Sequence, residues 1–164
     1  MNKASLCIVA GFLPLITITA LSFLDGSFSL FSDYVSKLGV GQYGVIFNAS
    51  LVIAAVLSAP FLANIRKGPV SYMFIGAAAA LAGVGLFPAS DSLHWYFAAA
   101  FFLLMFASIL VVGVTSKGMA RASVVVGLAG FAGLAVLTPP VEAALVYIIG
   151  LWVVAAALTY KKAR

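Results

Sequence analysis

His94 is the only histidine in the chain, and histidine is the side chain best suited to proton transfer near neutral pH. It lies in the stretch FPASDSLHWYFAAAFF, residues 87–102, where a turn containing Asp91 meets a long apolar run. A histidine beside a carboxylate can act as a general acid or base on a bound substrate, here a lipid headgroup. The candidate catalytic residues are therefore His94, Asp91 and Asp33.

The same residues also fit a structural role at a helix end. Ser90 or Asp91 is suited to cap a helix that begins near His94, because a short side-chain oxygen accepts the free amide groups of the first turn. His94 would then bond to an acidic group, Asp25, Asp33 or Glu142, and hold the first long connection in place. We favour this structural interpretation, and with it a non-enzymatic protein.

The sequence gives little support for a metal or a cofactor. A catalytic zinc site needs several His, Cys or carboxylate ligands that converge on one ion, and a membrane haem needs axial histidines from facing helices. The chain has one histidine and one cysteine, Cys7. Nor does it contain a nucleophile motif or a phosphate-binding loop. We therefore expect no metal site and no cofactor.

The composition is that of a membrane protein. Of the 164 residues, 65% are apolar and 8% are charged, and the mean hydropathy is +1.21. A soluble domain carries about 25% charged residues. The apolar runs are continuous rather than alternating, which indicates membrane-spanning helices and excludes a barrel.

Six apolar runs approach or reach the length of about 20 residues that spans a bilayer. They cover residues 4–24, 45–65, 70–87, 94–115, 122–138 and 141–160. The first is longer than the apolar core of a signal peptide, and no small-x-small cleavage motif precedes Asp25, so we expect a retained helix. The sequence thus predicts an all-α fold, with residues 1–164 forming a single six-helix transmembrane domain.

The charges alternate between the two ends of the predicted helices. All four acidic residues lie in or directly beside odd-numbered connections, whereas eight of the nine basic residues lie in even-numbered connections or at the termini. These eight are Lys3, Arg66, Lys67, Lys117, Arg121, Lys161, Lys162 and Arg164. Because Lys and Arg favour the cytoplasmic side, both termini are predicted to be cytoplasmic, in a multi-pass protein of the cell membrane. The net charge of +5 then reflects contacts with lipid headgroups, and no nucleic-acid partner is expected.

The first connection, residues 25–44, is the longest and is amphipathic. We expect it to form a short helix along the membrane surface that partly covers the external mouth of the bundle. Ser32 or Asp33 is suited to cap this helix, and Gly39 to end it. Asn48, about one turn inside the next helix, is expected to face a shallow external cavity.

Small and aromatic residues suggest how the helices pack. Small residues recur in two spans and let backbones approach closely, so the third and fifth helices are expected to be central. They are Gly76, Ala80, Gly83, Gly127, Gly130 and Gly133. Four aromatic residues lie near predicted membrane interfaces, as in an aromatic belt: Trp95, Tyr96, Trp152 and Tyr160.

Two stretches, DYVSKLGVGQYGVIFNASLVIAAVL and GLFPASDSLHWYFAAAFF, resemble the prokaryotic membrane family called domain of unknown function 998. The resemblance extends over nearly the whole chain and implies about six spanning helices. The family pattern corresponds here to Ser36, Leu38 and Gly39, then Asn48, then Phe87, Pro88 and His94. Lys37 stands where an acidic residue is common in the family, which argues against any role that needs a carboxylate at this position.

The resemblance groups Ser36, Asn48 and His94, and the predicted topology places all three near the outer face. We therefore take them as a candidate binding site at a polar extracytoplasmic mouth. The sequence favours an accessory or lipid-binding membrane component, with membrane lipids as partners and room for a homo-oligomer or a larger membrane complex. Two alternatives stay open: an enzyme that acts on lipid headgroups through His94 and nearby carboxylates, and a facilitator for a small neutral solute.

Overall fold

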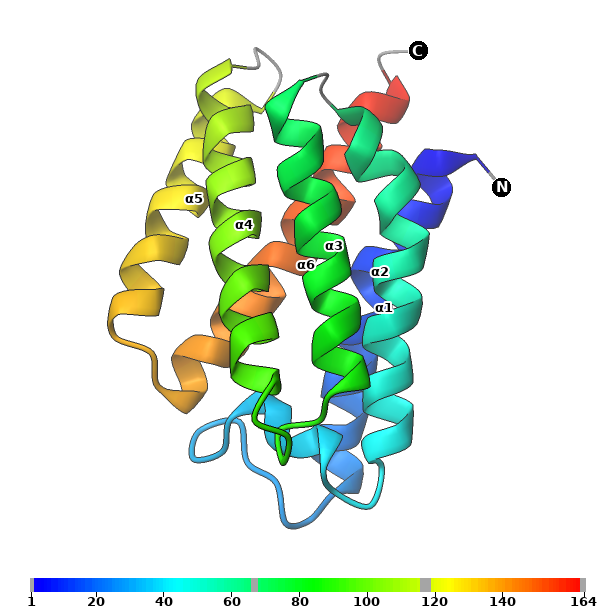
Figure 1. The fold of residues 1–164 in the computed structure, drawn as a ribbon, viewed down its shortest axis with the longest axis vertical. Helices are drawn as coiled ribbons and strands as arrows, with labels where there is room; N and C mark the ends of the chain where they lie inside the picture. The colour runs from blue at the N-terminus through cyan, green and yellow to red at the C-terminus, as the bar shows by residue number, and fades with distance from the viewer. Residues whose placement is uncertain (1, 66–67, 116–118, 163–164) are drawn as a thin grey trace.

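The computed structural model describes residues 2–65, 68–115 and 119–162, which form six α-helices and one short 3₁₀ helix, η1. In chain order they are α1 (Lys3–Leu24), η1 (Val35–Gly39), α2 (Gly44–Ile65), α3 (Pro69–Leu86), α4 (His94–Thr115), α5 (Ala120–Ala135) and α6 (Pro139–Lys162) (Figure 1). The all-α prediction is confirmed, and each helix agrees with its predicted range to within about one turn.

Five of these helices are long and apolar enough to cross a membrane, and α5, with 16 residues, is the exception. The shortening has a local cause at the boundary with α6. Pro139 and Pro140, expected to separate the two helices, instead form the first turn of α6, where a missing amide hydrogen costs nothing. That the chain crosses the membrane six times stays a prediction.

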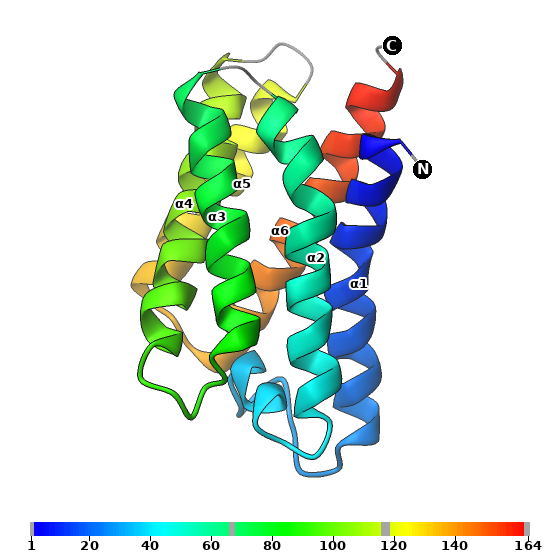
Figure 2. The same cartoon turned by 45° about the vertical axis from the view of Figure 1, so that its right-hand side comes forward.

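Helices that are consecutive in sequence pack side by side, and α1 also packs along α6. In Figures 1 and 2, α6 runs obliquely behind α2 and α3, and both chain ends lie at one end of the bundle. Lys3 and Arg121 begin helices at this terminal end, whereas η1 and the acidic residues lie at the opposite end. Arg66, Lys67, Lys117 and Arg164, which also entered the prediction of orientation, lie outside the described residues, as do the side chains of Lys161 and Lys162.

The bundle has two hydrophobic cores along its length. The larger is built from α1, α2, α3, α4 and α6 and contains Phe74, Phe106 and Trp152. Trp152 is 3% exposed, its ring stacks on Phe74 at 5.9 Å between centroids, and its indole N–H donates to Ser123. The prediction that Trp152 lies at a membrane interface is therefore wrong, because this indole finds both its apolar contacts and its hydrogen-bond partner inside the protein.

The smaller core lies at the η1 end. It joins α1, α2, α6 and the first connection, and its buried members are Ile18, Leu21, Phe28, Val35, Leu38, Phe47, Leu51 and Ala143. Val35 and Leu38 of η1 are 3% and 2% exposed. The first connection is thus packed into the end of the bundle, more deeply than a helix lying on the membrane surface.

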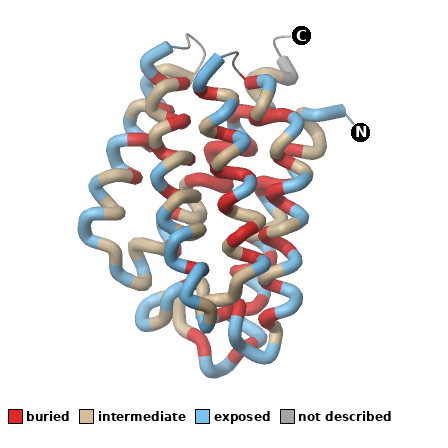
Figure 3. The backbone as a smooth tube through the Cα atoms, viewed as in Figure 1, coloured by how far each residue is buried: buried red, intermediate tan, exposed pale blue. Residues whose placement is uncertain are grey.

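Two glycines of α5 serve its contact with α4 rather than a central position in the bundle. Gly127 lies against Leu110 of α4, and Gly130 lies against the ring of Phe106. Figure 1 shows α5 at the edge of the bundle, and Figure 3 shows that its outer side is largely exposed. The expectation that the fifth helix is central is wrong: small residues here allow close packing of an outer helix on α4.

Candidate functional site

A cavity lies between the helices of the bundle and is lined by residues of α1, α2, α3, α4, α6 and η1. It offers about 100 Å³ to the centre of a water-sized sphere. One water molecule needs about 10–15 Å³ on this measure, so the cavity has room for a molecule several times larger. Its lining residues on α2 extend from Phe47 to Leu62, a span of about 22 Å at the helical rise. The cavity is therefore long and narrow, parallel to the helices.

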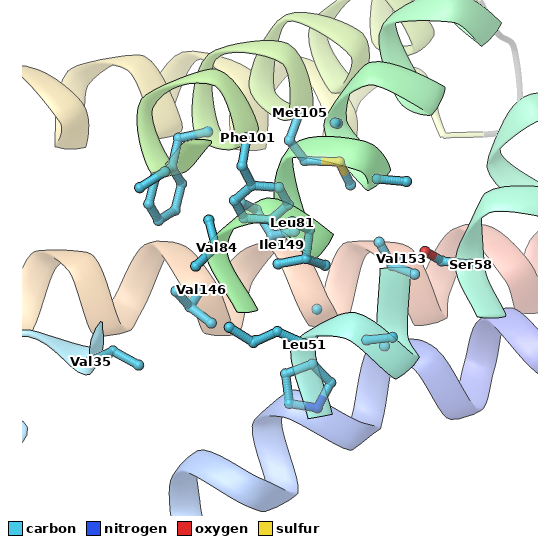
Figure 4. A pocket seen from close by; sticks show the side chains of 18 of the residues that line it. Val35, Leu51, Ser58, Leu81, Val84, Phe101, Met105, Val146, Ile149 and Val153 are labelled. Atoms are coloured by element: carbon cyan, nitrogen blue, oxygen red, sulfur yellow. The ribbon is translucent and has the colours of Figure 1, made fainter. Parts of the chain in front are cut away.

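Most of the cavity wall is apolar. Figure 4 shows side chains from four helices and η1 turned toward a common space: Leu51, Leu81, Val84, Phe101, Met105, Val146, Ile149 and Val153, with Val35 at one end. Ser58 also lines it, but its hydroxyl donates to the carbonyl oxygen of Ala55, 3.2 Å away in its own helix. The wall suits a hydrocarbon chain.

The polar part of the wall is at the η1 end, where Ser36, His94 and Glu142 line the cavity. Ser36 comes from η1, His94 is the first residue of α4, and Glu142 lies in the first turn of α6. Three segments far apart in sequence thus bring a hydroxyl, an imidazole and a carboxylate to one end of the cavity.

His94 is 5% exposed and its ring is held by main chain rather than by an acid. Nδ1 lies 2.8 Å from the carbonyl oxygen of Phe87, which ends α3. Since a carbonyl oxygen only accepts hydrogen bonds, Nδ1 carries the hydrogen, and Nε2 is an acceptor whenever the ring is neutral. The prediction of an acidic partner for His94 is wrong. His94 fastens the turn between α3 and α4, not the first connection.

Asp91 bonds to the backbone at the start of α4, as predicted, but the amide it accepts belongs to the residue just before the helix. Its carboxylate accepts the N–H of Leu93 at 2.8 Å, just before α4 begins, and its carbonyl oxygen accepts the N–H of His94. This arrangement satisfies an amide group that the helix start leaves free. Asp91 does not line the cavity.

Glu142 is the acidic residue that faces the cavity, and the sequence analysis proposed it only as a partner for His94. One of its carboxylate oxygens, Oε2, accepts the backbone N–H of Val35 at the start of η1. A signal was available in the sequence. A lone carboxylate at the start of an apolar span is costly in a membrane unless a specific partner or a polar cavity stabilises it.

Asp25 and Asp33 belong to the first connection and lie outside the cavity wall. The Ser27 hydroxyl donates to Asp25 at 2.7 Å, and this bond, with the Ser27 N–H, holds the pKa of Asp25 below its usual value. Lys37 pairs with Asp33 at 2.8 Å and is the main reason that the pKa of Asp33 is also lowered. A catalytic role for His94, Asp91 and Asp33 stays a prediction, and the structure does not bring the three together at the cavity.

Asn48 does not line the cavity; it joins α2 to η1. Its side-chain amide donates to the carbonyl oxygen of Gly39 at 2.9 Å. A Cβ at Gly39 would lie 2.6 Å from Asn48 Oδ1, so only glycine permits this approach. Of the predicted binding residues Ser36, Asn48 and His94, the first and last line the cavity, and Asn48 positions the segment that carries Ser36.

The helix in the first connection ends at Gly39 as predicted, but its start differs. Tyr34 precedes the first residue of η1 and makes no side-chain capping bond. Asp33 instead accepts the N–H of Ser29 and pairs with Lys37, so the predicted cap at Ser32 or Asp33 is wrong. The Val35 N–H that such a cap would have satisfied is taken by Glu142.

In the part of the chain that the structure describes, no three His, Cys, Asp or Glu side chains lie close enough together to hold a metal ion. The polar side chains at the η1 end of the cavity supply a hydroxyl (Ser36), an imidazole (His94) and a carboxyl group (Glu142).

Comparisons with known proteins give one family. Neither the curated proteins nor the solved structures contain a match to this chain. The sequence profile of the family described as "Protein of unknown function (DUF998)" matches residues 8–159 of the 164. The match includes η1, α2, α3, α4 and α5, most of α1 and α6, and all the residues that line the cavity. The chain therefore belongs to the DUF998 family, as the resemblance indicated.

Proposed function

We propose that this protein is a non-enzymatic membrane component that binds a small, elongated amphiphile inside its helix bundle. The observation that carries the proposal is the long apolar cavity with Ser36, His94 and Glu142 at one end. A hydrocarbon chain fits the apolar wall, and a polar head fits the η1 end. A site with this division of apolar and polar lining is typical of small-molecule binding.

The membrane setting determines which part of such a site gives selectivity. A hydrocarbon chain gains little by moving from lipid tails into an equally apolar cavity, because both surroundings exclude water. The chain is therefore held by packing alone, and discrimination between ligands falls to the polar end. Three polar side chains at one end are enough to orient an amphiphile.

A photoreactive long-chain alcohol, with a diazirine near the middle of its chain, tests this proposal in nanodiscs of zwitterionic lipid. We expect the label to map to cavity residues such as Leu51 and Phe101 in addition to residues that face lipid. Ala98 lines the cavity on α4, whereas its neighbour Ala99 is exposed. Ala98→Leu should reduce labelling of the cavity residues, and the matched variant Ala99→Leu should not. Labelling confined to the outward faces in the wild type would overturn the proposal.

The orientation in the membrane is part of the same proposal. The charge bias supports an η1 end outside the cell membrane and both termini in the cytoplasm. Gln42 is exposed at the η1 end, and the native Cys7 is buried. A Gln42→Cys variant in whole cells should react with a membrane-impermeant maleimide before lysis. Reaction only after lysis would reverse the orientation.

A further inference from the structure

We infer that the bound amphiphile has a cationic head that donates hydrogen bonds, such as a primary ammonium group. This inference rests on the proposed function and adds the chemical class of the ligand. It follows from which atoms at the polar end of the cavity are left without a protein partner, and from the charge that faces the cavity there.

Glu142 contributes a free acceptor. Its Oε2 accepts the Val35 N–H, and no hydrogen bond from a described residue reaches Oε1. Within the described residues, no buried side-chain nitrogen or oxygen lacks a hydrogen-bond partner. Oε1 is therefore accessible to a water-sized molecule, and the side chain that carries it lines the cavity. A carboxylate oxygen in this position only accepts hydrogen bonds.

His94 contributes a second acceptor. Its Nδ1–H is used on the Phe87 carbonyl oxygen, which leaves Nε2 of the neutral ring with a lone pair and no protein donor among the described residues. The hydroxyl of Ser36 can accept or donate. Two acceptors and one hydroxyl match a head with several N–H donors. An ammonium group has three such donors and no acceptor.

The charge at the cavity points the same way. Among the lining residues that the structure describes, Glu142 is the only acidic one, and none is Lys or Arg. Lys37, the basic residue of the first connection, donates hydrogen bonds to Asp33 and to the carbonyl oxygen of Ser27. A phosphate or carboxylate head would therefore meet the Glu142 carboxylate with no Lys or Arg among the described lining residues to balance it. A cationic head would pair with Glu142 in surroundings that screen the interaction weakly.

The experiment compares amphiphiles with one chain and different heads. Dodecylamine, dodecyltrimethylammonium, dodecanol and dodecanoate are each used to displace the photoreactive alcohol from the wild-type protein in zwitterionic nanodiscs. We expect dodecylamine to compete at about tenfold lower concentration than dodecanol, a difference of about 1.4 kcal/mol. Dodecyltrimethylammonium, which is charged but has no N–H donor, should compete less well than dodecylamine, and dodecanoate should be the weakest.

Variants assign the preference to particular atoms. Glu142→Gln keeps an oxygen that accepts the Val35 N–H but removes the charge, so it should abolish the advantage of the amine and leave dodecanol binding intact. His94→Asn keeps a donor near the Phe87 carbonyl oxygen and removes Nε2, so it should weaken amine binding to a smaller extent. Asp25→Asn removes a carboxylate at the same end of the bundle but outside the cavity, and it should preserve the preference.

The outcomes separate this inference from the proposed function. If dodecanol displaces the probe from the cavity as well as dodecylamine does, or if dodecanoate is the best competitor, the cationic head is wrong and the amphiphile site stands. If the advantage of the amine persists in Glu142→Gln, the inference also fails. If the probe never labels cavity residues, the proposed function itself fails. The wild-type series does not depend on the folding of any variant.

Discussion

Glu142 in the first turn of α6 accepts the backbone N–H of Val35, although 107 positions separate the two residues. This single bond joins the last helix to the first connection and holds η1 across the end of the cavity. It uses one carboxylate oxygen for structure and leaves the other for the proposed ligand. The same side chain thus anchors η1 and contributes to the polar end of the cavity.

The contribution of this hydrogen bond to stability can be measured by removing its acceptor. Glu142→Ala leaves the Val35 N–H buried without a partner, and we expect the free energy of unfolding to fall by about 1–3 kcal/mol. Glu142→Gln should lose much less, because its amide oxygen can accept the same bond. Chemical denaturation in detergent gives both values. Equal losses in the two variants would show that the carboxylate charge, rather than this bond, stabilises η1.

The contact of Gly39 with Asn48 should appear as coupling between the two positions. Asn48→Ala loses the bond to the Gly39 carbonyl oxygen, a cost of about 1 kcal/mol. Gly39→Ala should cost more, because its Cβ would lie 2.6 Å from Asn48 Oδ1. In the double variant that clash is gone, so the combined loss should be smaller than the sum of the single losses. A double-mutant cycle measures this coupling, and strict additivity would contradict it.

Two glycines of α5 should differ in their tolerance of alanine. A Cβ at Gly130 would overlap the Phe106 ring, which is fully buried and cannot move aside. A Cβ at Gly133 would meet the end of the Leu145 side chain at 2.9 Å, which can rotate away. We expect Gly130→Ala to lower the midpoint of thermal unfolding clearly and Gly133→Ala to change it little. The opposite order would mean that α5 is not packed on α4 through Gly130.

The lowered pKa of Asp25 predicts a dependence of stability on pH. A carboxyl group with a lower pKa in the folded state stabilises that state fully above its unfolded pKa, about 3.9, and this contribution is lost as the pH falls through the folded value. Ser27→Ala removes the hydroxyl donor that lowers this pKa most. The variant should therefore be less stable than the wild type at neutral pH, and the difference should shrink at pH values below about 4.

Ser32→Ala, at an exposed position in the same connection, serves as the control for this titration. Its thermal unfolding should follow the wild type at every pH. A difference between Ser27→Ala and the wild type that grows toward low pH would contradict the assignment of the hydroxyl to Asp25.

The helices could be predicted from the sequence because each is a continuous apolar run whose length is close to that needed to span a bilayer. It was less reliable at the junction of α5 and α6, where Pro139 and Pro140 fit a helix start as well as a break. Ser36 was found from the family pattern, whereas His94 stood out as the only histidine and also belongs to that pattern. Asn48 was assigned to the cavity because the pattern gives depth in the membrane but not the direction of a side chain.

Glu142 was not predicted as a site residue because its partner is set by tertiary structure. Val35 and Glu142 are brought together by the packing of η1 against α1, α2 and α6, which no local spacing encodes. The His94 contact was missed for a related reason. Its acceptor is a main-chain carbonyl at the end of α3. Every residue has such a carbonyl, so the residue types do not reveal this contact.

The short α5 has a consequence for the bilayer itself. Its 16 residues extend about 24 Å, against a hydrocarbon thickness of about 30 Å, while α4 beside it has 22 residues. If α5 crosses the membrane as the sequence predicts, the lipids along this edge must shorten to meet it, and hydrophobic mismatch concentrates on one side of the protein. The protein would then favour thin membranes, or associate with copies of itself so that the deformed bilayer regions around them overlap.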